Sequence, residues 1–409
     1  MEKYNVIKEN TNIRLGFPMF YGFWIVLNAL MARWARTGTN AGAGDFWWHN
    51  NRAEELLNLG IGGVHNLYHD AVALVSVVLG VEIFVSAGIV VFFMQMIFIV
   101  AIHFFAKHQL GEQYSDRWLL LVVAVTALAG SIPNLYSTNL LYFYGFGINV
   151  WHNPTTYTVM PFVIVSFFLF CYVLVQLNMK KSERMTVIIS GRKKVDILYL
   201  NYILLSLSLV LSVYGKASWI PAFGLSALIF LICWWAVSKF SYSRLKECIF
   251  VGLAFIPASL YFLYISANSV YSVADFVFRL PTFVYLQPFP VMLNLIFPTF
   301  VLYITRGKLV GNRVHQIAWL THVIAILQAT FIVEYRNGVS YEGHGNLSWS
   351  IFYSLTILVM VSLIEFIKHI EENVTHKYIS FTGLTLASVH LFSGIFYALG
   401  IWLGQGFWL

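Results

Sequence analysis

Acid, imidazole and guanidinium side chains occur together in the segment GDFWWHNNRAEELLNLG, residues 44–60. If residues 45–56 are helical, Asp45, His49 and Arg52 follow one another at spacings of four and three, which places them on one helix face. A carboxylate can accept the proton of a hydroxyl group, and a guanidinium can hold two phosphoryl oxygens at once. The pattern therefore predicts a site for group transfer, with Asp45 as the catalytic base.

Other polar segments carry side chains suited to a phosphorylated sugar donor. Arg279 in DFVFRLP and Arg336 in VEYRNG are the cations outside the first loop that we expect to hold phosphate. Sugar hydroxyls need hydrogen-bonding partners, and sugar faces pack on aromatic rings. The candidates for these contacts, together with those of the first loop, are His49, Arg52, His69, Trp151, His152, Asn153, Glu342, His344 and Asn346.

These segments interrupt a chain that consists mostly of apolar runs. Of its 409 residues 59% are hydrophobic and 11% are charged, whereas a soluble domain averages about 25% charged residues. Many runs reach the ~20 residues that cross a hydrocarbon core, and none alternates as a barrel strand does. The sequence predicts an all-α integral membrane protein, folded as one polytopic domain over 1–409 with about eleven spans. The runs are 16–34, 71–106, 118–136, 157–178, 196–214, 218–238, 247–267, 288–305, 315–335, 349–367 and 379–402.

The beginning of the chain should contain more than simple spans. The run 71–106 is too long for one crossing, so we expect a short interfacial or re-entrant helix followed by a span near 84–106. A helix over 45–56 can lie along the membrane surface, with Trp47 and Trp48 at headgroup depth and its polar face turned into a cleft.

Lysine and arginine are divided unequally between the two sides of the predicted bundle. Six of the 25 lie on the side of the first loop, and the other 19 lie in the amino terminus and in alternate short loops. Because positive residues favour the cytoplasmic side, we expect a cytoplasmic amino terminus and an external loop at 35–70. The net charge of +7 is then a topology signal and does not indicate nucleic-acid binding. The six are Arg33, Arg36, Arg52, Lys216, Arg279 and Arg336.

The layout of the first external loop resembles the GT-C superfamily of membrane glycosyltransferases. The shared features are a cytoplasmic amino terminus, one span, an acidic residue just after it, a surface helix, and a polar and aromatic patch before the next span. The likeness covers the topology of most of the chain, and at residue level it is confined to GDFWWHNNRAEELL. It implies that Asp45 matches the acidic residue that commonly serves as the base or its partner there. The chain departs from the best-known members in having no paired acidic motif at that point and no carboxy-terminal soluble domain.

Two later segments, NVWHNPTTYTVMPF (149–162) and YEGHGNLSW (341–349), look similar to stretches of bacterial envelope-polysaccharide enzymes, including repeat-unit polymerases. We therefore expect a glycosyltransferase that moves a sugar or oligosaccharide from a polyprenyl-phosphate-linked donor to a glycan or lipid acceptor, on the outer face of a bacterial inner membrane. An O-antigen or capsular polymerase or ligase with a diphosphate-linked donor is one alternative, and a lipid-linked oligosaccharide transporter is another. Membrane lipids are expected partners and nucleic acid is not. The pattern identifies no cofactor, and it leaves open whether the enzyme uses a divalent cation.

The same residues also have structural interpretations. Asp45 could cap the helix that follows GAG, and His49 with Arg52 could form a solvated face or pair with Asp45. His65 and His69 have the i, i+4 spacing of zinc ligands, without a third ligand in the sequence nearby.

Further along the chain, Trp151 could belong to an aromatic belt, and Glu334 could form a purely structural pair with Arg336. The histidines inside spans are expected to be satisfied core residues. They are His103, His322 and His390.

Overall fold

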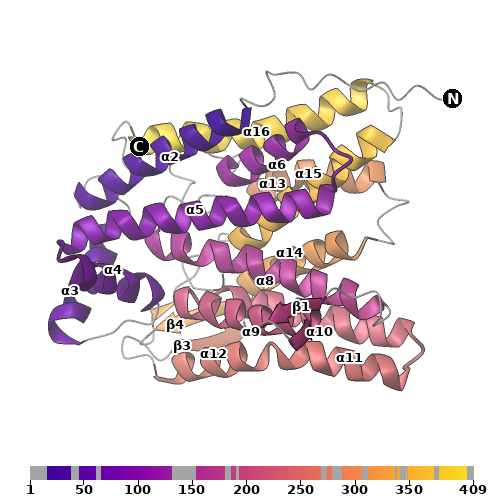
Figure 1. Cartoon of the computed structure of the whole chain (residues 1–409), viewed down its shortest axis with the longest axis horizontal. Helices are drawn as coiled ribbons and strands as arrows, with labels where there is room; N and C mark the ends of the chain where they lie inside the picture. Colours follow the sequence, from indigo (N-terminus) through magenta and orange to yellow (C-terminus); the bar gives the residue numbers. More distant parts are fainter. Residues whose placement is uncertain are drawn as a thin grey trace.

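Helices make up most of the part of the chain that the computed structural model describes (Figure 1). The described residues are 16–37, 46–60, 66–130, 153–179, 186–189, 193–268, 274–278, 288–305, 312–336, 339–340, 347, 349–372 and 377–402. The helices are α2 (Gly16–Thr37), α3 (Phe46–Leu59), α4 (Asn66–Leu79), α5 (Ile83–Leu110), α6 (Asp116–Leu128), α8 (Pro154–Asn178), α9 (Ile197–Gly215), α10 (Trp219–Val237), α11 (Tyr242–Leu253), α12 (Ile256–Asn268), α13 (Pro288–Thr305), α14 (Arg313–Phe331), α15 (Trp349–Glu372) and α16 (Lys377–Trp402).

Seven of the described helices are long and apolar enough to cross a membrane, namely α5, α8, α9, α10, α14, α15 and α16. α11 and α12 meet at an angle of 43°, and this bent pair would make an eighth span. Shorter apolar stretches lie in α2, α4 and α13. The protein therefore has the multi-helix architecture of a membrane protein, as predicted, while the number of eleven crossings stays a prediction.

The apolar run at 71–106 is divided into two helices, as predicted, while the interfacial or re-entrant position of the first stays a prediction. α4 ends at Leu79, and α5 begins at Ile83. Between them Gly80 has a φ of +63°, a conformation that favours glycine. The Val81 amide donates to the Ser76 carbonyl (3.2 Å), and the Ser76 hydroxyl donates to the Val81 carbonyl (2.6 Å). This turn places α4 beside α3 at one end of the bundle, at the left of Figure 1, which we call the α3–α4 end.

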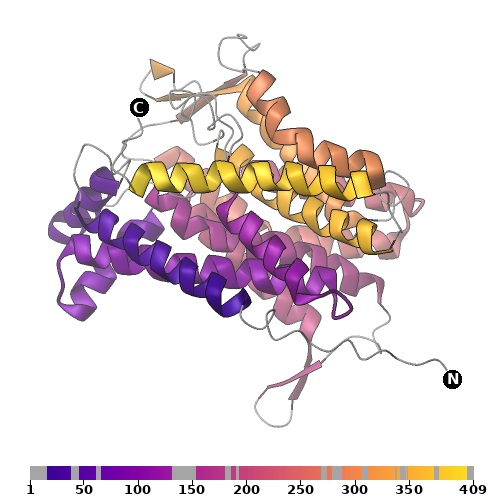
Figure 2. The ribbon, with the colours of Figure 1, turned by 90° about the horizontal axis from the view of Figure 1, so that it is seen from above.

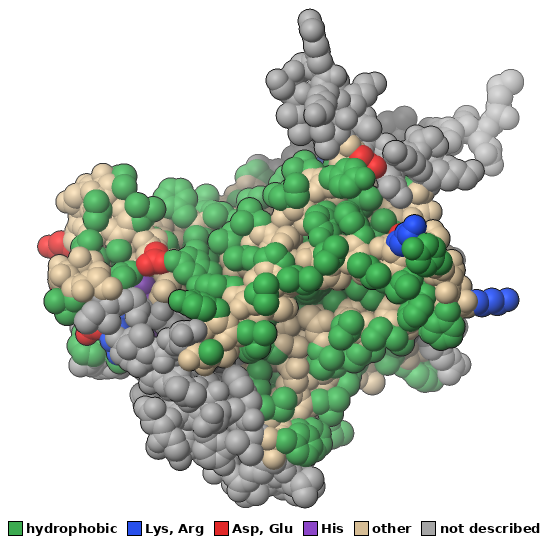
Figure 3. All heavy atoms as spheres, turned by 90° about the horizontal axis from the view of Figure 1, so that it is seen from below, with side chains coloured by type: hydrophobic (Ala, Val, Ile, Leu, Met, Phe, Trp, Pro, Cys, Tyr) green, Lys and Arg blue, Asp and Glu red, His purple; other side chains and the backbone are tan. Residues whose placement is uncertain are grey.

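Apolar side chains fill the centre of the bundle and also cover its outside. α8 and α15 are buried along most of their length and pack against α5, α9, α13 and α14. The outer faces of α5, α9 and α12 expose large apolar side chains, including Phe104, Ile203 and Leu260. Figure 3 shows hydrophobic side chains over the middle of one face, with charged side chains mostly toward the two ends. Contact with lipid around the middle requires this distribution, because charges in hydrocarbon are costly.

Two small antiparallel sheets lie in the connections, and the sequence analysis did not anticipate them. A hairpin of β1 and β2 separates α8 from α9 and projects from the helices in Figure 2. In the second sheet β4 lies between β3 and β5, with Ala274 opposite Arg336 and Phe278 opposite Ile332. α14 therefore ends at Phe331, earlier than the predicted run to 335, because the following residues pair with β3. The strands are β1 (Thr186–Ile189), β2 (Lys193–Asp196), β3 (Ala274–Phe278), β4 (Ile332–Arg336) and β5 (Val339–Ser340).

α6 also ends earlier than its predicted run to 136, because a crossing with α16 redirects the backbone. Beyond Leu128 the chain is extended, and the Gly130 amide donates to the His390 carbonyl (2.9 Å). His390 Nδ1 in turn donates to the Gly130 carbonyl (3.1 Å). A Cβ added to Gly394 would overlap the Leu128 carbonyl oxygen. α6 and α16 thus meet backbone to backbone, with no room for a side chain at Gly394.

Candidate functional site

α3 presents two different faces to its surroundings. Phe46, His49 and Asn50 are buried against the bundle, whereas Trp48 is 54% exposed. The helix predicted over 45–56 is confirmed, and it continues to Leu59, where Gly60 with a φ of +68° ends it. His49 and Asn50 therefore face the protein, and the two tryptophans face outward.

Two histidines of the first loop meet at the α3–α4 end. His49 Nδ1 lies 2.9 Å from His69 Nε2, and the two rings stack with centroids 5.1 Å apart. Beside them the Tyr68 hydroxyl donates to Asn50 Oδ1 (2.6 Å). Burial raises the pKa of Tyr68 above its ordinary value, so the phenol stays protonated and keeps donating. These contacts hold α3 against α4.

Asn153 connects the histidine pair to the start of α8. It is the N-cap of this helix, and its Oδ1 accepts from the Thr155 amide (2.9 Å) and from the Thr155 hydroxyl (2.5 Å). Pro154 follows at the first helical position, where its missing N–H costs nothing. Nδ2 of Asn153 lies 3.4 Å from His49 Nε2. The position of this amide is thus a consequence of where α8 begins.

Helix capping also sets the direction of the hydrogen bonds. Because Oδ1 of Asn153 accepts from a backbone amide, Nδ2 is the donor and His49 Nε2 must accept. His49 then carries its hydrogen on Nδ1 and donates to His69 Nε2, so the hydrogen of His69 is on Nδ1. We assign these tautomers from the network of partners. In this arrangement both imidazoles are neutral, and the hydrogen of His69 is on Nδ1.

A buried lysine extends the same series of hydrogen bonds beyond Thr155. Lys216 is 3% exposed, and its Nζ donates to the Thr155 hydroxyl (3.3 Å). The same Nζ lies 3.7 Å from the centroid of the Trp349 ring, a contact that contributes about 2 kcal/mol for a desolvated cation. Lys216 directly follows α9, and a cation is favoured at a helix carboxyl end. We call the continuous series Lys216, Thr155, Asn153, His49 and His69 the polar chain.

The structure brings three of the predicted site residues together, His49, His69 and Asn153. Two histidines of the first loop thus lie beside the residue that begins α8. The backbone of Arg336 lies in β4, and its side chain is outside the described atoms, as is the predicted pair with Glu334. The predicted site residues that lie outside the described part of the chain, with roles that stay predictions, are Asp45, Trp151, His152, Arg279, Glu342, His344 and Asn346.

Arg52 has a local partner on its own helix. Its Nη1 lies 2.7 Å from Glu55 Oε2, and its guanidinium carbon lies 4.9 Å from the centroid of the Trp48 ring. The side chain is partly exposed, so it can reach a ligand by exchanging this ion pair. The alternative pairing with Asp45 concerns a residue outside the described range.

Each of the histidines inside the predicted spans has a hydrogen bond, although among the described residues Nε2 of His390 has no partner. His103 Nδ1 lies 2.6 Å from the Tyr21 hydroxyl, and His322 Nδ1 lies 2.9 Å from Ser354 Oγ. His390 bonds the carbonyl of Gly130 as described above. Each fixes a contact between two helices.

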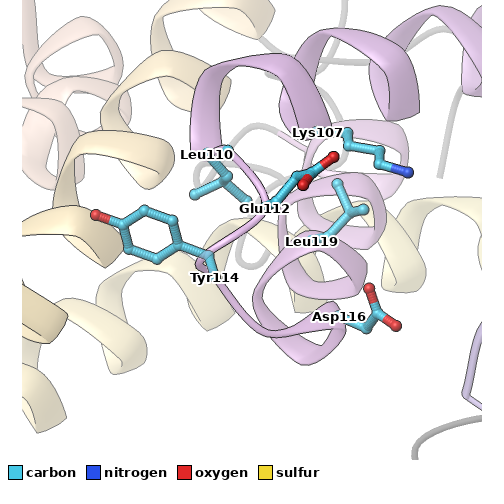
Figure 4. A pocket seen from close by; sticks show the side chains of 7 residues that line it. Lys107, Leu110, Glu112, Tyr114, Asp116 and Leu119 are labelled. Atoms are coloured by element: carbon cyan, nitrogen blue, oxygen red, sulfur yellow. The ribbon is translucent and has the colours of Figure 1, made fainter.

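A hollow at the opposite end of the bundle is a weaker candidate for a site. It lies where α5 turns into α6, has a volume of about 220 Å³, and is lined by exposed charged side chains, including Lys107, Glu112 and Asp116 (Figure 4). Ligand pockets commonly measure about 300–1,000 Å³ and bury most of the ligand. This hollow is smaller and open to solvent, so the polar chain is the better candidate.

A comparison with known protein families, with curated proteins and with solved structures finds no match to this chain. Within the described residues, no group of three or more His, Cys, Asp or Glu side chains could hold a metal ion. His65, the predicted zinc partner of His69, is outside that part of the chain. The chemistry of the site therefore has to be argued from its own geometry.

Sequence reasoning missed two members of the polar chain, Thr155 and Lys216. Lys216 was counted only as a charge on the side of the first loop. It is the one lysine among the six basic residues assigned to that side, in the apolar setting SVYGKASWIPAF. This isolation was the signal that could have identified it, because a lone lysine between two spans has few places to reach water.

Proposed function

We propose that this protein is a membrane glycosyltransferase that moves a sugar from a polyprenyl-phosphate-linked donor to a glycan or lipid acceptor, at the α3–α4 end and on the outer side of a bacterial inner membrane. The observation that carries the proposal is the buried polar chain at that end of an apolar bundle. Polar groups in such a setting are costly and commonly functional. The polar chain contains the ammonium group of Lys216 and the imidazoles of two histidines. Donors of these kinds suit the oxygens of a phosphate leaving group and of a sugar.

In the reaction we propose, Asp45 takes the proton of the acceptor hydroxyl. The acceptor oxygen then forms a bond to the anomeric carbon of the donor sugar, and the bond from that carbon to the phosphate oxygen breaks. The phosphate leaves with the electron pair of that bond, and nearby cations stabilise its charge. Arg279 and Arg336 are proposed for this role because they are the two cations outside the first loop that the sequence suggests for holding phosphate.

Asp45→Asn tests the role of the base. This substitution keeps the shape of the side chain but removes the proton acceptor, so sugar transfer should fall by about 10²- to 10⁴-fold at equal membrane abundance. The readout is mass spectrometry of lipid-linked glycans in a host that lacks the wild-type chain and carries the variant. If Asp45 only caps α3, Asn should serve equally well, and near-wild-type glycan output would exclude Asp45 as the base. Asp196→Asn, which changes the cap of α9 at the opposite end, is the matched control.

A host in which this protein is deleted, called the deletion host below, separates the proposed function from its alternatives by the glycans that accumulate. A transferase leaves an acceptor glycan that lacks one sugar or one oligosaccharide. A polymerase would leave single unpolymerised repeat units, and a transporter would leave a complete lipid-linked glycan on the cytoplasmic leaflet. Either of the last two outcomes would contradict the proposal.

A further inference from the structure

Two helices begin in contact with the Lys216 ammonium, and a third begins just after Lys216 in the sequence. Thr155, which accepts its hydrogen bond, is the second residue of α8, and Trp349, which it lies over, is the first residue of α15. Ser218, two residues beyond Lys216, is the N-cap residue of α10. The first turn of a helix has backbone N–H groups without intrahelical acceptors, and the helix dipole is positive there. The surroundings of Lys216 therefore favour an anion.

Three buried hydroxyl groups lie near these helix starts. They belong to Thr156, Ser218 and Tyr353, and each side chain is 0% exposed. The Tyr353 hydroxyl is adjacent to that of Thr156, and among the described residues neither has a further hydrogen-bond partner, while the Ser218 hydroxyl has none at all. The Tyr353 ring packs 6.5 Å from that of Trp219, the residue after Ser218. Buried hydroxyls without partners are destabilising, and a ligand rich in acceptor oxygens would satisfy them.

We propose that these groups form a binding subsite for a phosphoryl group. The side chains of the subsite are Thr155, Thr156, Lys216, Ser218 and Tyr353, and none of them is acidic. An ammonium, several hydroxyls and converging helix amino ends together recognise a phosphate through its charge and its acceptor oxygens. Identification of this phosphate with that of the lipid-linked donor rests on the proposed function, whereas the same chemistry would also bind the headgroup phosphate of a bilayer lipid.

The subsite is coupled to the first loop through the polar chain. Lys216 donates to Thr155, Thr155 to Asn153, and Asn153 to His49. The amide of Asn153 does not relay protons readily, so the chain positions groups and does not conduct protons. A phosphate bound at Lys216 would thus be held in a fixed relation to the α3 helix, which Asp45 directly precedes.

Binding of farnesyl phosphate to the purified full chain, in nanodiscs of phosphatidylcholine, tests the subsite. Lys216→Met removes the ammonium and should weaken binding by about 10-fold or more. Ser218→Ala removes one hydroxyl and should weaken it by about 5-fold. Lys368→Met, at the opposite end of the bundle, is the matched control and should bind like the wild type. Farnesol, which lacks the phosphate, should bind all four proteins equally weakly.

Unchanged farnesyl phosphate affinity in a folded Lys216→Met protein would overturn the subsite. If Lys216→Met does not fold, Ser218→Ala decides alone, because no described hydrogen bond depends on that hydroxyl, and unchanged binding then overturns the subsite. Replacing part of the phosphatidylcholine by phosphatidylglycerol separates the sources of the phosphate: competition at equal concentration would assign the subsite to a bilayer lipid and overturn the donor assignment. Lys216-dependent binding combined with normal glycans in the deletion host would support the subsite while rejecting the glycosyltransferase function.

Discussion

The two ends of the bundle use polar side chains in different ways. At the α3–α4 end, the polar chain is buried and links α9, α8, α3 and α4. At the opposite end, Arg244 and Glu247 form an ion pair of 2.6 Å within α11, three residues apart and partly exposed. The contact between Tyr114 and Glu372 (3.2 Å) joins the turn after α5 to α15 and is open to solvent, and the buried contact between Asn201 and Gln176 (3.4 Å) joins only α8 and α9.

The two ends therefore differ in how polar groups contribute to stability, locally at the surface and cooperatively in the buried network. An ion pair at the surface is screened by water and contributes little, so either partner can be changed without much effect. Members of a buried network depend on one another, because each loses its water and must find its partners inside the protein. We therefore expect substitutions at the α3–α4 end to disturb several helices at once and those at the opposite end to stay local.

Access for an impermeant thiol reagent should differ completely between the two ends. Glu54 on α3 and Lys239 beyond α10 are both exposed. In spheroplasts of a Cys233→Ser background, Glu54→Cys should be labelled and Lys239→Cys should be labelled only after permeabilisation, because the basic residues are expected on the cytoplasmic side. Asn50 on the same helix is unsuitable for cysteine labelling, because its side chain is 0% exposed. Labelling of Lys239→Cys alone would invert the orientation and move the proposed site to the cytoplasm.

Two helix caps offer a matched test of the buried network. Asn153 caps α8 and Asp196 caps α9, each accepting from the backbone amide two residues on at 2.9 Å. Asp196→Ala should lower the free energy of unfolding by about 1 kcal/mol, the usual loss for a cap. Asn153→Ala also removes the contacts of Asn153 with His49 Nε2 and with the Thr155 hydroxyl, so the loss should be about 2–4 kcal/mol. Chemical or thermal unfolding in the same detergent measures both.

Equal losses from the two cap substitutions would contradict the cooperative nature of the polar chain. Asn153→Ser provides a further check, because serine can cap α8 but cannot reach His49 with an amide. Its stability should lie between those of the wild type and Asn153→Ala.

Exposed ion pairs should contribute equally little at both ends. Arg52 with Glu55 on α3 and Arg244 with Glu247 on α11 have the same i, i+3 spacing and similar lengths of 2.7 and 2.6 Å. Glu55→Gln and Glu247→Gln should each change the free energy of unfolding by less than about 1 kcal/mol, with a smaller effect at high salt. A loss of several kcal/mol from Glu55→Gln alone would mean that Arg52 belongs to the buried network.

The smallest effect is expected at Asp70, next to His69 on α4. Burial raises the pKa of this carboxyl above its ordinary value. A raised folded-state pKa favours the protonated form, so its contribution to stability is present at low pH and is lost as the pH rises through the folded-state pKa. Asp70→Asn should therefore stabilise the protein slightly at pH 7, and the difference should disappear near pH 4. A destabilised variant at pH 7 would instead indicate that the charged carboxylate has a favourable partner.

The helical part of this fold follows from local sequence, whereas the site depends on contacts that local sequence does not encode. The division between α4 and α5 was predictable because one apolar run exceeded the thickness of a bilayer. The partner of His69 was not predictable in this way. The sequence suggested His65, four residues earlier, whereas the structure pairs His69 with His49, which lies 20 residues earlier on another helix.

The same limitation applies to the second sheet and to Lys216. β3 and β4 pair although 53 residues lie between the end of one and the start of the other, from Phe278 to Ile332, and neither is a long alternating run. Lys216 became a candidate only when its contacts with Thr155 and Trp349 were visible. Asp45, the residue with the strongest prediction from sequence, lies outside the described residues, so its role rests on the sequence alone.

The crossing of α6 and α16 bears on the order in which the protein is assembled during synthesis. His390 follows Gly130 by 260 residues, so the ribosome adds the partner of the Gly130 amide long after α6 has been made. A buried amide without a partner is costly, so the end of α6 is completed only when α16 arrives. Because Gly394 permits the close approach to Leu128, a side chain at this position would arrest biogenesis at its last stage, after nearly all other helices had been made.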